Sequence, residues 1–352
     1  MPRKNKGRNV LISRFSALGD VAMTLPSVYN ACLANSDDNF YFLTRHHPAQ
    51  IFINAPKNLT IIGVDFENYR GISGIWRLAS SLKLRYKIDL YLDLHDVIRT
   101  KLLRIFLSLR GVRIFKIRKG RAAKKKLTRP NRKVLIQLTP TTRRYEEVFA
   151  RGGIGLTDSF SSLFGKEKGD TKAFEAVTSP KGERERWIAI APFAKHEGKI
   201  YPFPQMEKVV EQLASESDTK IFIFGFGEKE RDLIDTLSSR HTNVVNMAAI
   251  QLGIGSELAL LSHCDVMISM DSANMHLASL VGLRTISIWG ATHPYTGFLG
   301  WRQNPADVVQ LDMTCRPCSV FGSKPCMRGD YHCLHGITPQ MILHKINQLT
   351  HQ

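Results

Sequence analysis

The sequence predicts an α/β protein built from two doubly wound domains. Two series of short apolar runs, each suited to a buried parallel strand, alternate with segments of helical spacing. Between them lie residues 111–180, which are basic at first and rich in glycine and serine later. Alternating strands and helices indicate a parallel sheet covered on both faces. We therefore expect two Rossmann-like domains, residues 1–178 and 183–335, that face each other across a cleft and bind a ligand at the carboxyl ends of their strands.

The first series begins with a short apolar strand and a turn. Residues 9–14 suit a buried strand, and the turn that follows ends in Gly19 and Asp20. Apolar residues at helical spacing from Val21 onward predict a helix over residues 21–35. Further strands are expected at residues 40–44, 61–64 and 90–94, and an apolar, basic helix at 97–109.

The second series follows a linker at residues 179–182, where proline and glycine interrupt the pattern. Its strands are expected at residues 187–191, 221–224, 244–246, 266–269 and 285–288. We expect residues 336–352 to form a C-terminal helix that packs back on the N-terminal domain.

The formal net charge is +18, and most of the excess is concentrated in one segment. Between Arg99 and Lys133 there are fifteen Lys or Arg residues and no Asp or Glu. Such a block favours a polyanionic partner, which is nucleic acid, an anionic membrane leaflet or a phosphorylated glycolipid. A solvated basic face without a partner would give the same pattern.

No apolar stretch approaches the roughly eighteen residues that a membrane-spanning helix needs. The basic N-terminus is followed by an apolar run of only Val10–Ile12, which is too short for the core of a signal peptide. We therefore expect the protein to stay in the cytoplasm.

The turn after the first strand is the first candidate site. Gly19 allows a close approach of the backbone to a ligand, and Asp20 falls at the start of the next helix. An acid at this position is favoured by the helix dipole whether or not it takes part in chemistry. Spacing alone therefore leaves both a capping role and a base role open.

A second candidate site lies between Asp271 and His276, after an expected strand. Free backbone N–H groups at a helix start bind phosphate, and Ser272 adds a hydroxyl donor. The carboxylate of Asp271 is better suited to sugar hydroxyls. A capping Asp with a core-facing His276 is the structural alternative.

Two further segments follow strands of the second series. Residues 224–230 begin like a dinucleotide fingerprint, but Glu230 stands at the third glycine position, which argues against hydride transfer. Glu228 can instead accept hydroxyls from a ribose or a sugar. Lys199 can neutralise a departing phosphate, although a lysine is most often simply exposed.

Six cysteines are present, and their surroundings differ. Cys32 and Cys264 lie in apolar segments and are expected to be core thiols. The other four are spaced as C-x2-C-x7-C-x6-C, at Cys315, Cys318, Cys326 and Cys333. Reduced thiols are expected in a cytoplasmic protein, and a structural zinc site is the alternative.

Several segments together resemble the ADP-heptose:lipopolysaccharide heptosyltransferases of glycosyltransferase family 9. The resemblance extends from about residue 9 to 347. It is carried by residues 10–21, 89–95, 198–202, 271–278, 288–294 and the cysteine-rich tail that ends at 336–341.

The resemblance implies a GT-B fold and an inverting, metal-independent transfer of heptose from ADP-heptose to the inner core of lipopolysaccharide, without a cofactor. It implies that Asp20 is the general base and that Lys199 contacts the donor phosphate. The donor-binding set that it implies comprises Gly19, Glu228, Asp271, Ser272, Ala273 and His276. Ala273 stands where the family usually has Gly.

The resemblance also gives the basic block a role. A phosphorylated glycolipid acceptor at the anionic inner face of the inner membrane is expected to bind Arg118, Lys119, Arg121, Lys124, Lys125 and Lys126. We expect a peripheral, monomeric enzyme. Transfer from a different nucleotide-sugar donor is one alternative. A nucleic-acid-binding protein is the other, although the block has only Phe106 and Phe115 as aromatic residues.

Overall fold

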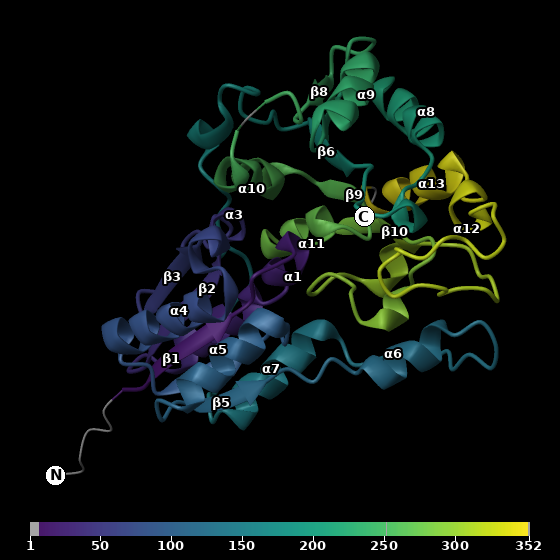
Figure 1. The fold of residues 1–352 in the computed structure, drawn as a ribbon. Coiled ribbons are helices and arrows are strands. Elements are labelled where there is room, and N and C mark those ends of the chain that lie inside the picture. Colours follow the sequence, from purple (N-terminus) through teal and green to yellow (C-terminus); the bar gives the residue numbers. More distant parts are fainter. Residues whose placement is uncertain (1–6, 251, 351–352) are drawn as a thin grey trace. The chain divides into compact units, whose positions relative to one another are not determined.

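The computed structural model describes residues 7–250 and 252–350. The chain divides into two compact units (Figure 1). The first comprises residues up to 119 and 141–163, and the second comprises 120–140 and 164 onward. Residues 120–140 and 164–178 thus group with the second unit, whereas the sequence pattern places them in the first.

Unit 1 is a five-stranded parallel sheet in the order β3-β2-β1-β4-β5, which is the doubly wound order expected of a Rossmann-like unit. Its core joins apolar side chains of β1, β4, α4 and α5. The elements are β1 (Asn9–Ser13), α1 (Leu18–Ala22), α2 (Leu25–Ala34), β2 (Asn39–Arg45), α3 (His46–Ala49), β3 (Leu59–Val64), α4 (Gly71–Tyr86), β4 (Leu90–Asp93), α5 (Ile98–Ser108), β5 (Arg113–Lys116) and α7 (Thr141–Arg151).

The single helix predicted over residues 21–35 is two helices, α1 and α2. Pro26 lies in the first turn of α2, where its missing N–H costs nothing, whereas inside a continuous helix it would break a hydrogen bond. The hydroxyl of Thr24 donates to the carbonyl of Val21 (2.7 Å) at the junction. The break leaves α1 as a short helix that carries Gly19 and Asp20.

Unit 2 is a six-stranded parallel sheet in the order β11-β10-β9-β6-β7-β8, which is again doubly wound. Its strands are almost wholly buried, as expected when helices cover both faces. The elements are α6 (Arg121–Thr128), β6 (Arg186–Ala191), α8 (Phe203–Ala214), β7 (Thr219–Ile223), α9 (Glu228–Ser238), β8 (Val244–Asn246), α10 (Ile254–His263), β9 (Val266–Met270), α11 (Ala273–Leu280), β10 (Thr285–Ile288), β11 (Val308–Val309), α12 (His332–His335) and α13 (Pro339–Thr350).

The predicted C-terminal helix is α13, which groups with unit 2, and its packing on the N-terminal domain stays a prediction. Ile342, Leu343 and Ile346 of α13 belong to the core of unit 2, together with residues of α8. The hydroxyl of Tyr201 lies 3.0 Å from the carbonyl oxygen of Ile337, just before α13. The apolar face of α13 is thus buried in the core of unit 2.

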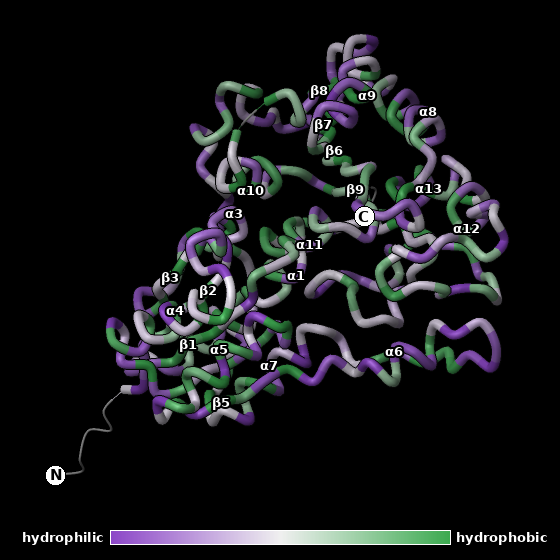
Figure 2. The backbone as a smooth tube through the Cα atoms, in the orientation of Figure 1, coloured by the Kyte–Doolittle hydropathy of each residue, from purple (hydrophilic) through white to green (hydrophobic). Residues whose placement is uncertain are grey.

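Residues 111–180, which lie between the two predicted series of strands, contain β5, α6 and α7. The buried residues of α7 are Thr141, Tyr145, Val148 and Phe149. The last three have helical spacing, which is sufficient to predict this helix from the sequence. Figure 2 shows hydrophobic strands in both sheets and a largely hydrophilic α6. Among the described residues, no helix has both the length and the apolar character that crossing a bilayer requires.

Candidate functional site

Asp20 lies at the carboxyl end of β1, as predicted, in the first turn of α1. Its Oδ2 accepts a hydrogen bond from the backbone N–H of Ala17 (3.2 Å), which fixes the carboxylate at the helix start. The same oxygen lies 2.8 Å from Nη2 of Arg14. The side chain of Asp20 is 27% exposed, so its carboxylate is fixed by these contacts and is still accessible to solvent.

Arg14 is the residue of this loop that the sequence analysis missed. It is buried, and its Nη1 donates to the carbonyl of Leu94 (2.9 Å) at the end of β4. The guanidinium is thereby tied to a neighbouring strand end while it faces Asp20. A buried arginine fixed at both sides holds its carboxylate partner in one geometry.

His95 lies beside this pair on the loop after β4. Its Nδ1 accepts the backbone N–H of Phe15 (3.3 Å). Burial, reinforced by the positive charges of Arg14 and Lys119, lowers the pKa of His95 to about 3. The imidazole is therefore neutral at physiological pH, with its proton on the nitrogen that does not face Phe15.

Asp93 shapes the loop that carries His95. Its Oδ1 accepts the backbone N–H groups of His95 and Asp96, both at 2.9 Å. Its Oδ2 is paired with Arg104 of α5. The buried carboxylate thus closes the turn and fixes where His95 lies.

Two exposed arginines gather on the ring of Phe66 near this loop. The guanidinium carbons of Arg45 and Arg99 lie 6.0 and 5.1 Å from the ring centroid. Phe66 in turn packs on Phe15 (4.5 Å between ring centroids). In the described part of the chain, neither arginine has a carboxylate partner within 4.0 Å. Neither arginine was predicted, although Arg45 directly follows a predicted strand and so lies at the same sheet edge as Asp20.

In unit 2, Lys199 and Asp271 form a largely buried pair. Nζ of Lys199 lies 2.8 Å from Oδ2 of Asp271 and donates to its backbone carbonyl (3.1 Å). Asp271 directly follows β9, and Lys199 ends the short helix that follows β6. Gly198 is required here because a Cβ would lie 2.9 Å from the carbonyl oxygen of Gly322. The structure thus joins two predicted residues that are 72 positions apart.

The other predicted donor residues extend from this pair along α11. Ser272 precedes the helix, and its hydroxyl lies 3.3 Å from that of Ser269. Ala273 begins α11, and His276 is buried one turn later. The first turn of α11 therefore presents backbone N–H groups next to the ammonium of Lys199, an arrangement suited to phosphate.

Glu228 begins α9 after the loop that follows β7, and its side chain is exposed. Glu230, on the same turn, accepts the backbone N–H of Phe226 (2.7 Å). Glu230 is thus used in holding the loop, whereas Glu228 faces solvent. This leaves Glu228 as the acid suited to ribose hydroxyls.

The predicted docking residues are divided between the two units. Arg118 and Lys119 belong to unit 1, and Nζ of Lys119 donates to the carbonyl of Asp96 (3.2 Å). Arg121 and Lys124–Lys126 lie on α6 of unit 2. Nζ of Lys124 lies 4.2 Å from the ring centroid of Phe298.

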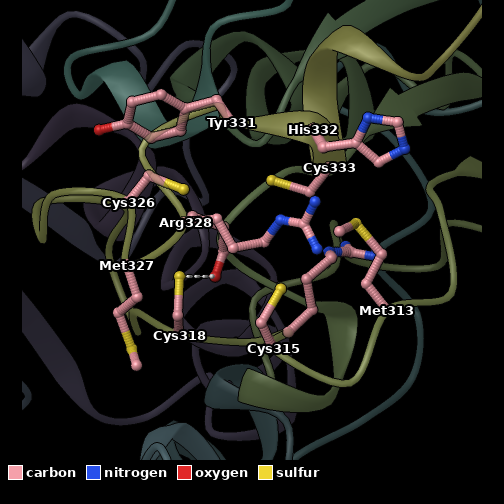
Figure 3. A pocket seen from close by; sticks show the side chains of 11 residues that line it. Met313, Cys315, Cys318, Cys326, Met327, Arg328, Tyr331, His332 and Cys333 are labelled. Carbon is pink, nitrogen blue, oxygen red and sulfur yellow. Dashed lines mark hydrogen bonds between the residues drawn. The ribbon is translucent and has the colours of Figure 1, made fainter.

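The four late cysteines line one pocket of unit 2 (Figure 3). The buried Arg316 beside them donates to the carbonyls of Trp289 (3.0 Å), Gly290 and Thr292 (2.9 Å), and so fixes the loop after β10. Cys32 and Cys264 are buried, as predicted. In the described residues no three His, Cys, Asp or Glu side chains are arranged to hold a metal ion.

Comparison with known proteins agrees with this architecture. Residues 75–326 match the family described as glycosyltransferase family 9 (heptosyltransferase). Lipooligosaccharide heptosyltransferase 2 of Campylobacter jejuni is 27% identical over 135 residues, which are 37% of this chain. The match spans 41% of that relative, so the chain covers about two fifths of its length.

Two solved structures share the fold over nearly the whole chain. A glycosyl transferase family 9 protein from Veillonella parvula has a TM-score of 0.72 at 16% identity and covers 97% of each chain. The E. coli ADP-heptose lps heptosyltransferase II has a TM-score of 0.68 at 16% identity and covers 97% of this chain and 98% of its own. The two doubly wound units are those of the GT-B fold. With its sequence match across more than half of its length, the chain belongs to glycosyltransferase family 9, the heptosyltransferases.

Proposed function

We propose that this protein transfers heptose from ADP-heptose to the inner core of lipopolysaccharide, with inversion at the anomeric carbon. The observation that carries the proposal is the Asp20 carboxylate, which is held by Arg14 and the start of α1 at a strand end. Family membership supports it, as does the likeness to a heptosyltransferase whose name specifies ADP-heptose.

The proposed step is a single displacement. Asp20 takes the proton of an acceptor hydroxyl as its oxygen attacks the anomeric carbon of the donor. The bond from that carbon to the β-phosphate oxygen breaks, and ADP leaves with the electron pair. One base and no enzyme nucleophile give inversion.

We propose that Lys199 and the first turn of α11 balance the charge that ADP gains. The ammonium is held by Asp271, and the helix start supplies backbone N–H groups and the hydroxyl of Ser272. These donors provide positive potential from the chain itself, so we expect transfer without a divalent cation. Full activity after treatment with EDTA tests this part, and activity that returns only with added metal contradicts it.

The acceptor is proposed to be an anionic glycolipid. Arg45 and Arg99 are exposed, stacked on Phe66 and without a carboxylate partner in the described residues. Guanidinium groups so placed suit the carboxylate or phosphate of an inner-core acceptor. The basic residues of α6 favour an anionic membrane surface, and we propose peripheral binding at the inner face of the inner membrane.

The experiment that tests the function combines a donor screen with mass spectrometry of the glycolipid product. The purified chain is incubated with an inner-core acceptor and ADP-heptose, or with ADP-glucose or a UDP-sugar in its place. We expect the mass of the acceptor to increase by one heptose with ADP-heptose and not with the other donors. Efficient transfer from another nucleotide sugar shows instead a family member with a different donor, and no product with any donor rejects the transferase assignment.

A further inference from the structure

Three consecutive apolar side chains are exposed on the segment that follows α6. Val134, Leu135 and Ile136 are 36%, 52% and 57% exposed. Folded proteins avoid such runs on their surface unless the run has a function. These three residues are here called the apolar strip.

The apolar strip is held in place by unit 2. The backbone N–H of Val134 donates to the carbonyl of Lys126 (3.2 Å), so the strip lies beside the last turn of α6. Nζ of Lys133 donates to the carbonyls of Cys315 (2.5 Å) and Pro317 (3.1 Å). Beyond the strip, the buried Leu138 donates its N–H to the carbonyl of Tyr295 (2.9 Å). Both ends are anchored while the strip itself stays outside.

The surroundings of the strip are strongly cationic. Arg121, Lys125 and Lys126 of α6 are exposed, as is Arg132 just before the strip. The segment from Arg99 to Lys133 contains no acidic residue. An exposed aliphatic strip therefore directly adjoins a basic helix.

We infer that residues 120–140 form a membrane anchor with two components. The cations of α6 bind anionic lipid headgroups, and the apolar strip enters the boundary between headgroups and acyl chains. Membrane-surface elements combine these two kinds of side chain because either alone gives only weak, reversible binding. This inference rests on the proposed function, since a glycolipid acceptor places the substrate in that membrane.

The chemistry of the strip favours lipid over the other polyanions. Nucleic acid would use the cations and would stack its bases on aromatic rings, but the strip is purely aliphatic. The anchor belongs to the unit that carries Lys199 and the first turn of α11. The proposed anchor thus lies on the same unit as the proposed donor-binding residues.

The test is co-sedimentation of the full chain with vesicles of phosphatidylcholine alone or with about one third phosphatidylglycerol, at low and high salt. The paired variants are Leu135→Ser with Ile136→Ser, and Lys125→Gln with Lys126→Gln. Phe226→Ser is the matched control, because Phe226 is 89% exposed and lies elsewhere on unit 2. No substrate is present, so binding is read without catalysis.

We expect the wild type to bind anionic vesicles at least about 10-fold more tightly than neutral ones. The serine pair should weaken binding by about 10-fold at both salt concentrations, whereas the glutamine pair should reduce the salt dependence. The control should bind like the wild type. Wild-type binding by the serine pair, or an equal loss in Phe226→Ser, overturns the anchor.

Two further readouts distinguish a lipid surface from a second protein copy or a nucleic acid. If light scattering shows a dimer that the serine pair dissociates, the strip contacts a second copy of the chain and the membrane assignment is overturned. If the serine pair binds vesicles like the wild type but loses affinity for an oligonucleotide, the partner is a nucleic acid. Transfer to a water-soluble, lipid-free acceptor should be unchanged by the serine pair. Normal vesicle binding without any transfer by the wild type would reject the proposed function and leave the anchor standing.

Discussion

Nη2 of Arg14 lies 2.8 Å from Oδ2 of Asp20, and the other end of the same guanidinium donates to the carbonyl of Leu94. The carboxylate at the end of β1 is therefore fixed by an arginine that is itself fixed to the end of β4. The contacts that cap the helix also hold this oxygen in place, so helix capping and the proposed role as a general base are compatible.

Replacing Asp20 with Asn removes the proton acceptor while it keeps the size of the side chain. We expect kcat to fall by about 100-fold or more, while the melting temperature stays within a few degrees of the wild-type value. Asp37→Asn is the control, since Asp37 is exposed on the same unit. Steady-state transfer assays and thermal unfolding measure both quantities, and activity within a few-fold of wild type would remove Asp20 from the base role.

Arg14 is a positioning residue, so its substitution should affect kcat more than KM. For Arg14→Gln we expect kcat to fall by about 10- to 100-fold through a displaced carboxylate, with near-normal affinity for ADP. Arg14→Lys keeps the charge and should recover part of the loss. Equal losses in the two variants, with a matching loss of ADP affinity, would indicate general misfolding instead.

Lys199→Gln should weaken the donor side alone. Because the ammonium is proposed to meet the phosphates of ADP, we expect a loss of about 100-fold in kcat/KM and a smaller stabilisation by ADP in thermal shift. Lys195→Gln is the matched control, as Lys195 lies four residues earlier on the same loop. An ADP shift that Lys199→Gln leaves intact would contradict the assignment.

Arg45 and Arg99 should determine the affinity for the acceptor. Each lost charge-assisted contact is worth about 2 kcal/mol, so each single Gln variant should raise the acceptor KM by roughly 10-fold or more without changing the donor KM. Arg85→Gln is a control of the same kind, because Arg85 stacks on Tyr86 (5.3 Å) elsewhere in unit 1. If the donor KM rises instead, the two arginines serve a different ligand.

His95 makes the stability of the fold depend on pH. Its pKa is about 3 in the folded chain, below that of an exposed histidine, so the unfolded chain binds a proton first as the pH falls. Titration of His95 therefore leaves the free energy of unfolding unchanged above about pH 6.5 and lowers it as the pH falls toward 3. The loss is about 2 kcal/mol at pH 5. The melting temperature of His95→Gln should therefore fall less between pH 7 and 5 than that of the wild type. Parallel curves would show that His95 does not titrate in this way.

The strands and the loops at their ends were the predictable part. Buried parallel strands leave continuous apolar runs, and β1 with Asp20 after it followed from one such run. The pairing of Lys199 with Asp271 was not predictable from spacing, since it depends on β6 and β9 being neighbours in the sheet. Arg45 and Arg99 were missed for the same reason: only the fold brings them to Phe66.

The return of the chain from one unit to the other has a practical consequence. The path leaves unit 1 at residue 119, comes back at 141 and leaves again at 163, so two segments of unit 2 precede the apparent linker at 179–182. A cut at that linker would part Phe174 from Trp187 (6.1 Å between ring centroids) and the 120–140 segment from Tyr295. Chimeras between relatives must therefore exchange residues 120–140 together with 164 onward. A fragment that ends at residue 178 would include two segments of unit 2 without the rest of the unit on which they pack.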